Sequence, residues 1–202
     1  MGGKLRKNES ANKLILTRFA RLAKKFGIGF IAAVVTGIIS GLLLRLIMKI
    51  IALVFPHMAG GFTFEGTSLL VVFGIGFSLA NSIIYMCIYR YLPKRWISKG
   101  FIYGCLNLIV YGIPFFLSNP DNDLFGPQAP LGITLFSLLF LFSGIFLAWL
   151  VNLLINWVDQ SNGRLKYTYL FFIILIVPAI VMSYGIIHEI FTELIPAIRS
   201  NF

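Results

Sequence analysis

Histidines and glutamates beside two apolar segments are the side chains that could perform acid–base or metal chemistry. His188 and Glu189 are neighbours, and Glu193 follows about one helical turn later. His57 and Glu65 lie in a connection between two apolar segments and could join them in an outer polar pocket. Imidazole and carboxylate groups are common ligands and proton acceptors at hydrolytic metal sites. These five residues are therefore candidates for a functional site.

A metal site is only one of the hypotheses for these residues. The stretch from His188 to Glu193 lacks the second histidine of the HExxH helix that holds zinc in metalloproteases. The two cysteines, Cys87 and Cys105, form no pattern typical of a metal centre. We therefore expect no metal and no cofactor, and we keep a membrane-embedded, metal-dependent hydrolase as the alternative function.

Two basic residues, Arg45 and Lys49, interrupt the end of an apolar segment. A charge near the centre of a bilayer costs at least about 2.5–3.5 kcal/mol, so it needs a partner, water or a route to the headgroups. Glu189 and Glu193 lie at a matching depth if the first and last segments run in the same direction, because a helix rises about 1.5 Å per residue. We expect ion pairs between these bases and acids. The same charges could instead bind an ion, a proton or a polar solute on a transport path.

Uncharged polar side chains recur every fourth residue in two further apolar segments. Tyr103, Asn107 and Tyr111 share one face of a helix, and Asn152 and Asn156 share a face of another. Buried amides in lipid usually form hydrogen bonds between helices. We expect these residues to join helices, and a solute path that they line is the alternative.

The composition indicates that lipid is the main solvent of the chain. Of its 202 residues, 58% are hydrophobic and 12% are charged, with a mean hydropathy of +0.90. Water-soluble domains carry about 25% charged residues, so this chain has too little polar surface for water. The net charge is +10, but Lys and Arg cluster beside apolar runs, where they meet anionic headgroups. We expect no nucleic-acid partner.

Five runs with few charges approach or exceed the length of a membrane-spanning helix, which needs about 20 apolar residues. Their hydrophobicity is continuous rather than alternating, and this favours helices over the strands of a barrel. We predict an all-α, polytopic transmembrane helix bundle. Its transmembrane domain covers residues 27–195, with spans at 27–54, 68–91, 100–118, 131–157 and 168–191.

Basic residues alternate between the connections of this bundle. They crowd the N-terminal tail and the connections after the second and fourth spans, whereas the first and third connections carry acidic residues. Because Lys and Arg are retained on the cytoplasmic side, we predict a cytoplasmic N-terminus and a C-terminus outside. Residues 196–202 are then a short external tail, and the chain is a multi-pass protein of the cell membrane.

The basic tail, residues 1–26, contains an amphipathic segment over residues 11–26. Apolar residues from Ile15 to Phe26 share one face of a helix, and basic residues crowd the other face. Such a helix could lie on the inner leaflet. The alternative is an ordinary basic flank that sets the topology, and the sequence leaves both open.

Small residues at intervals of four predict close helix packing. They are Gly29, Ala33, Gly37 and Gly41 in the first span, and Gly74, Ser78 and Ser82 in the second. Small side chains let helix backbones approach one another closely in lipid. We expect packing inside one chain, with the face of a homo-oligomer as the alternative.

Together these features predict a non-enzymatic membrane protein. It would be a small transporter or an accessory subunit of a membrane complex, because the short connections leave no room for a soluble domain. Its expected partners are the lipid bilayer, with anionic headgroups in the inner leaflet, and a second copy or another membrane protein.

Overall fold

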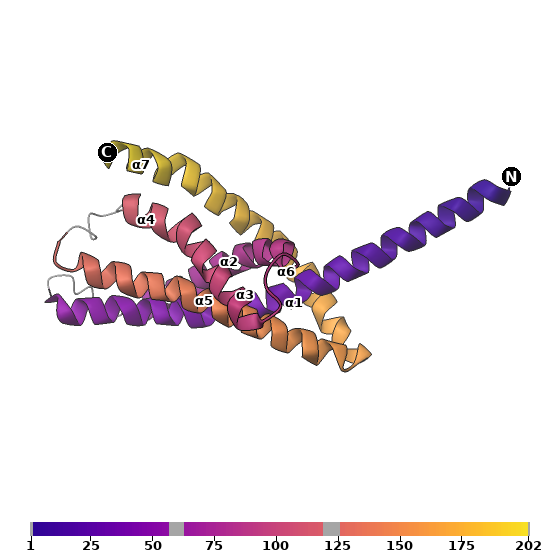
Figure 1. Ribbon diagram of the computed structural model, residues 1–202, viewed down its shortest axis with the longest axis horizontal. Coiled ribbons are helices and arrows are strands. Elements are labelled where there is room, and N and C mark those ends of the chain that lie inside the picture. Colours follow the sequence, from indigo (N-terminus) through magenta and orange to yellow (C-terminus); the bar gives the residue numbers. More distant parts are fainter. Residues whose placement is uncertain (1, 57–62, 119–125, 202) are drawn as a thin grey trace.

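The chain folds into helices. The computed structural model describes residues 2–56, 63–118 and 126–201, and within these ranges it contains no strand. The helices are α1 (Gly2–Val54), α2 (Phe64–Ile88), α3 (Trp96–Asn107), α4 (Ile113–Ser118), α5 (Ala129–Asp159), α6 (Asn162–Glu189) and α7 (Ile195–Asn201) (Figure 1). Two π-helical segments, η2 (Leu108–Gly112) and η4 (Ile190–Leu194), join α3 to α4 and α6 to α7. The all-α prediction is confirmed.

Five helical stretches in the described part of the chain are long and apolar enough to cross a membrane. They are Leu16–Val54, Phe64–Ile88, Trp96–Ser118, Ala129–Asp159 and Gly163–Arg199. Each contains most of one predicted span, so the five-helix pattern read from hydropathy is confirmed.

The first helix begins far before the predicted span and includes the amphipathic segment over residues 11–26. We predicted a span from residue 27, but α1 is continuous from Gly2 to Val54. No proline interrupts this segment, and most of its residues favour helix over coil. The resulting 53-residue helix is about 80 Å long. Its N-terminal part continues straight on from the rest of α1 and projects away from the other helices (Figure 1).

The second helix is displaced along the chain relative to the expected span, 68–91. Thr63 caps its beginning, because the Thr63 Oγ1 accepts a hydrogen bond of 3.1 Å from the backbone N–H of Gly66. At the other end the chain turns and reaches Pro93, which has no backbone N–H to donate to a helix. The cap and the proline explain why the helix begins and ends earlier than predicted.

Both π-helical segments end two residues before a proline, at Pro114 and Pro196. A proline inside an α-helix removes a hydrogen bond, and its ring clashes with the carbonyl four residues earlier. In η2 the backbone N–H of Ile113 donates to the carbonyl of Leu108, five residues back, and this wider turn accommodates the ring. The third span therefore continues past Pro114 to Ser118, the end that we predicted for it.

Glycines bring α1 and α2 into backbone contact. A Cβ built on Gly37 would lie 2.4 Å from the Cα of Ile75, and one built on Gly74 would lie 2.5 Å from the carbonyl oxygen of Gly37. A Cβ on Gly41 would lie 2.7 Å from the carbonyl oxygen of Leu70. Such separations are too short for any side chain, so these small residues pack α1 against α2 within one chain.

A second pair of helices, α3 and α5, is packed in the same way. A Cβ built on Gly144 would lie 2.5 Å from the Cα of Gly104, and one built on Gly100 would lie 2.5 Å from the Cα of Ile145. The two pairs meet where α1 touches α5. The hydroxyl oxygens of Ser40 and Ser143 form a hydrogen bond of 2.7 Å between these two helices.

The last long helix, α6, contacts α2 through Met182, which lies against Gly76, and contacts α1 at its own beginning. There a Cβ on Gly27 of α1 would lie 2.0 Å from the carbonyl oxygen of Thr168, which is fully buried. Further along α6, apolar side chains such as Ile173 and Val177 are 69% and 64% exposed. The chain then reaches α7, which lies beside α4 (Figure 1).

Replacing a glycine at the α1–α2 contact is expected to destabilise the fold. Gly37→Ala would force α1 and α2 apart and lower the free energy of unfolding by about 1–3 kcal/mol. Thermal unfolding in a mild detergent, followed by circular dichroism, measures this change.

The matched control is Gly185→Ala in α6, where an added Cβ meets no atom within 4 Å. Alanine favours helix over glycine by up to about 1 kcal/mol, so this variant should be as stable as the parent or slightly more stable. An equal loss of stability in both variants would contradict the proposed contact.

Candidate functional site

The outer charges predicted from the sequence lie on two different parts of the molecule. The guanidinium group of Arg45 lies against the beginning of α2, since one of its nitrogens would be 3.7 Å from a Cβ built on Gly66. Glu65 is exposed in the same first turn. Glu189 and Glu193 are exposed on α6 and η4, in the arm that leads to α7 and α4.

Arg45 and Lys49 lie in α1, whereas Glu189 ends α6 and Glu193 lies in η4. Our expectation assumed that two helices running in one direction stay neighbours along their whole length. Instead, α6 touches α1 closely near Gly27 and its continuation lies beside α4. The proposed ion pairs therefore stay a prediction.

His188 makes contacts within its own helical arm. Its carbonyl oxygen accepts a hydrogen bond of 2.9 Å from the Thr192 hydroxyl, and its ring centroid lies 6.1 Å from that of Tyr184. His57 lies outside the described residues, so its place in an outer pocket is not known. Over the described ranges, no three His, Cys, Asp or Glu side chains gather closely enough to hold a metal ion.

Three tyrosines and two other polar residues lie between α2 and α3. We call this group the tyrosine cluster, and its members are Asn81, Tyr85, Tyr89, Lys99 and Tyr103. The hydroxyl of Tyr103 donates a hydrogen bond of 2.6 Å to the carbonyl oxygen of Asn81. The ring centroids of Tyr103 and Tyr85 are 4.9 Å apart, and those of Tyr85 and Tyr89 are 5.7 Å apart, in edge-to-face contacts. Aromatic rings therefore connect α2 to α3, where no glycine contact does.

Lys99 places a positive charge inside this cluster. The residue is only 7% exposed, and its ammonium nitrogen lies 3.4 Å from the centroid of the Tyr89 ring. Such a cation–π contact contributes about 0.5–2 kcal/mol, whereas removing an ammonium group from water costs several kcal/mol. No described carboxylate pairs with Lys99. Its charge is consequently offset only in part.

Tyr85 is fully buried in the middle of the cluster, and its hydroxyl has no hydrogen-bond partner among the described residues. The hydroxyl of Thr36, in α1, is also buried and has no hydrogen-bond partner among the described residues. A buried polar group without a hydrogen bond costs about 1–3 kcal/mol. The Tyr85 hydroxyl is therefore free to donate a hydrogen bond to a group that enters the cluster.

Of the other polar residues predicted to join helices, Asn107 adjoins Tyr103 of the cluster, and the others lie outside it. Tyr111 is half-buried, and its ring lies 5.1 Å from that of Phe77 in an edge-to-face contact. Asn107 is buried in α3. Asn152 is half-buried and Asn156 is exposed, and neither side chain forms a hydrogen bond with another described residue.

Sequence reasoning found Tyr103 but missed three members of the cluster. Asn81 and Tyr85 of α2 and Tyr89 directly after it are spaced by four residues, which is the same signal that pointed to Tyr103. Lys99 was read only as one of the charges that set the topology. Nothing in the sequence showed that its ammonium group is buried against a ring from the preceding helix.

Comparison with known proteins assigns no function to these residues. The chain matches no protein family, no curated protein and no solved structure. Its function must therefore be argued from its own residues.

Two identical substitutions in neighbouring rings should have different effects on stability. Tyr103→Phe removes the donor that satisfies the carbonyl of Asn81, so we expect a loss of about 0.5–1.5 kcal/mol. Tyr85→Phe removes a buried hydroxyl that has no described partner, so it should leave stability unchanged or raise it. Thermal unfolding in detergent compares the two, and a larger loss for Tyr85→Phe would contradict the geometry.

Proposed function

We propose that the chain is a five-span integral membrane protein of the cell membrane that transports a small anion without an enzymatic step. The support for membrane insertion is the set of five long apolar helices and the low content of charged residues. The alternation of basic residues supports a cytoplasmic N-terminus and a C-terminus outside.

The observation that carries the choice of an anion is the buried charge of Lys99. Its ammonium group has a ring as its neighbour and no described carboxylate. The unpartnered hydroxyl of Tyr85 belongs to the same cluster. Both groups can donate hydrogen bonds to an anion, which would offset the cost of burying the charge. The cluster contains no acidic residue that would repel such a ligand.

The position of the cluster also suits movement of a solute. It lies at the boundary between two helix pairs, each of which is held together by glycine contacts. Across this boundary α2 and α3 meet through side-chain rings. Rings can change rotamer more easily than packed backbones can separate. We therefore propose that the α3–α5 pair moves relative to the α1–α2 pair as the anion passes.

An accessory subunit is the second candidate function. The feature that favours it is α6, whose apolar side chains beyond its first turns are largely exposed. In a membrane this face would meet either lipid or another protein. The predicted alternative of a metal-dependent hydrolase has no group of metal-binding side chains in the described ranges to support it.

Transport can be measured in liposomes that contain the purified protein. Liposomes are loaded in turn with chloride, acetate or phosphate, and release of each is followed with time. We expect at least one of these anions to leave faster than from protein-free liposomes. Lys99→Gln should lower that rate at least about tenfold, because it removes the charge that holds the anion.

The matched control is Lys94→Gln, which is exposed in the connection just before α3 and should keep the parent rate. Thermal unfolding shows whether each variant is folded. The proposal would be contradicted if none of the three anions left faster than from protein-free liposomes. It would also be contradicted if the two substitutions changed the rate equally.

A further inference from the structure

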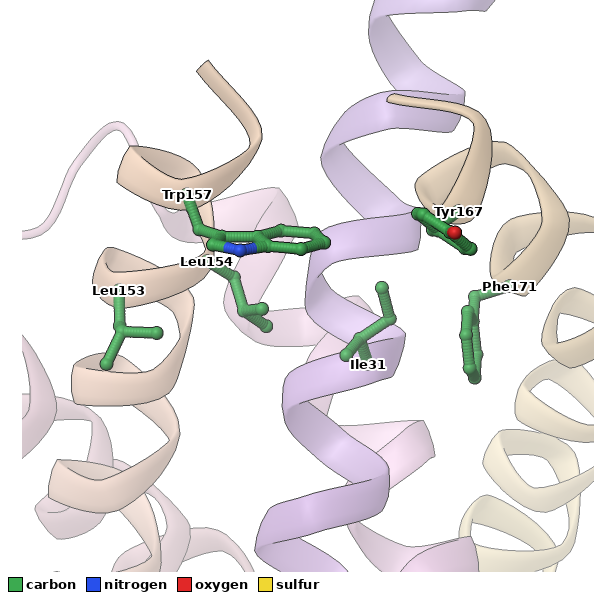
Figure 2. Close-up of a pocket in the computed structure, with 6 residues that line it drawn as sticks. All are labelled: Ile31, Leu153, Leu154, Trp157, Tyr167 and Phe171. Carbon is green, nitrogen blue, oxygen red and sulfur yellow. The ribbon is translucent and has the colours of Figure 1, made fainter. Parts of the chain in front are cut away.

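An apolar groove of about 470 Å³ lies between three helices, at the end of the molecule where α5 stops and α6 begins. This volume falls in the range of about 300–1,000 Å³ found for small-molecule sites. Figure 2 shows Trp157 of α5 and Tyr167 of α6 next to α1, with Ile31 of α1 below and between them. The remaining lining residues are Leu153, Leu154 and Phe171.

Two amphipathic rings mark one end of this groove. The ring centroids of Trp157 and Tyr167 are 6.4 Å apart, and the aliphatic side chains of the groove lie on one side of them (Figure 2). Trp and Tyr are enriched where the hydrocarbon of a membrane meets its headgroups, because each has an apolar body and a polar tip. The aliphatic part of the groove would then lie in the hydrocarbon, and the rings at the headgroup level.

Arg164 adds a positive charge at the ring end of the groove. Its guanidinium carbon lies 4.8 Å from the centroid of the Trp157 ring. One of its nitrogens, Nη1, donates to the carbonyl oxygen of Trp157 at 2.9 Å and to the side-chain oxygen of Gln160 at 3.0 Å. Arginine has five N–H donors, so the N–H groups of Nε and Nη2 remain available. Their planar arrangement suits a phosphate group.

The acidic residue of this region is already paired. Between Leu153 and Phe171 the sequence contains one carboxylate, Asp159. Its oxygen lies 2.6 Å from the ammonium nitrogen of Lys24 in α1. This ion pair ties α1 to the end of α5 and leaves the charge of Arg164 without a competing carboxylate. The groove therefore combines apolar walls with a cationic rim.

We propose that this groove binds an anionic phospholipid. One acyl chain would lie along Ile31, Leu153 and Phe171, and the lipid phosphate would lie against Arg164. The positive charge of Arg164 complements the lipid phosphate, and the apolar walls lie where the acyl chain would follow it. This combination favours a lipid over a helix from a second copy. The inference rests on the proposed membrane insertion, since the lipid must reach the groove from a bilayer. It does not depend on anion transport through the tyrosine cluster.

The experiment measures lipid retained by the full chain in native mass spectrometry from a mild detergent. Phosphatidylglycerol and phosphatidylcholine with the same acyl chains are added in equal amounts. We expect preferential retention of phosphatidylglycerol, and Arg164→Gln should weaken it about tenfold by removing charge-assisted hydrogen bonds. Leu153→Trp, in the exposed wall of the groove, should lower retention of both lipids by filling the space.

The matched control is Arg90→Gln. Arg90 is exposed and its guanidinium carbon lies 4.5 Å from the centroid of the Tyr91 ring, which does not line the groove, whereas Arg164 contacts the lining residue Trp157. It should keep the parent preference for phosphatidylglycerol. An equal effect of Arg90→Gln and Arg164→Gln would overturn the site, as would an unchanged preference in Arg164→Gln. A dimer lost only on Leu153→Trp would show that a second copy occupies the groove.

These outcomes separate the lipid site from the proposed membrane insertion. A parent chain that retains neither lipid, and that alkaline carbonate releases from membranes, would contradict insertion itself. A chain that stays in the membrane but shows no preference for phosphatidylglycerol would contradict the lipid site alone.

Discussion

Satisfying every backbone N–H and C=O without water is the constraint on which this structure depends, given the lipid environment that we propose. In lipid an unsatisfied peptide group costs several kcal/mol, so a spanning segment has to be helical. The chain meets this constraint even at prolines, because η2 widens the helix before Pro114 and the third span continues to Ser118. Lipid also gives no hydrophobic drive for helix association. Close contact at Gly37 and Gly144 therefore supplies the packing between helices.

These glycine contacts decide where the polar residues can act. They hold α1 against α2 and α3 against α5, whereas aromatic side chains join α2 to α3 across the boundary between the pairs. Tyr85 and Tyr103 fill that boundary, and Lys99 is buried beside it. The groove that we assign to a lipid lies elsewhere, between α1, the end of α5 and the beginning of α6. Packing thus separates the proposed path for an anion from the proposed site for a lipid.

Hydropathy predicts the five helices because each needs only a sufficient run of apolar residues, and spacing by four finds Gly37 and Tyr103. The sequence does not reveal which helices become neighbours. Arg45 was matched to Glu189 by depth alone, but its guanidinium group lies against the beginning of α2. The sequence predicted an amphipathic segment over residues 11–26, but not that it continues into the first span as one helix from Gly2. The burial of Lys99 depends on the ring of Tyr89, which follows α2, and no spacing of residues around Lys99 in the sequence predicts this contact.

Labelling of single cysteines with an impermeant thiol reagent tests the proposed membrane topology most directly. The native Cys87 and Cys105 are replaced by serine, and one cysteine is introduced at Glu65 or at Ser161, both exposed beside long helices. Five spans with a cytoplasmic N-terminus predict that Glu65→Cys reacts in intact cells and that Ser161→Cys reacts only after permeabilisation. Reaction of Ser161→Cys in intact cells, with Glu65→Cys protected, would contradict the topology.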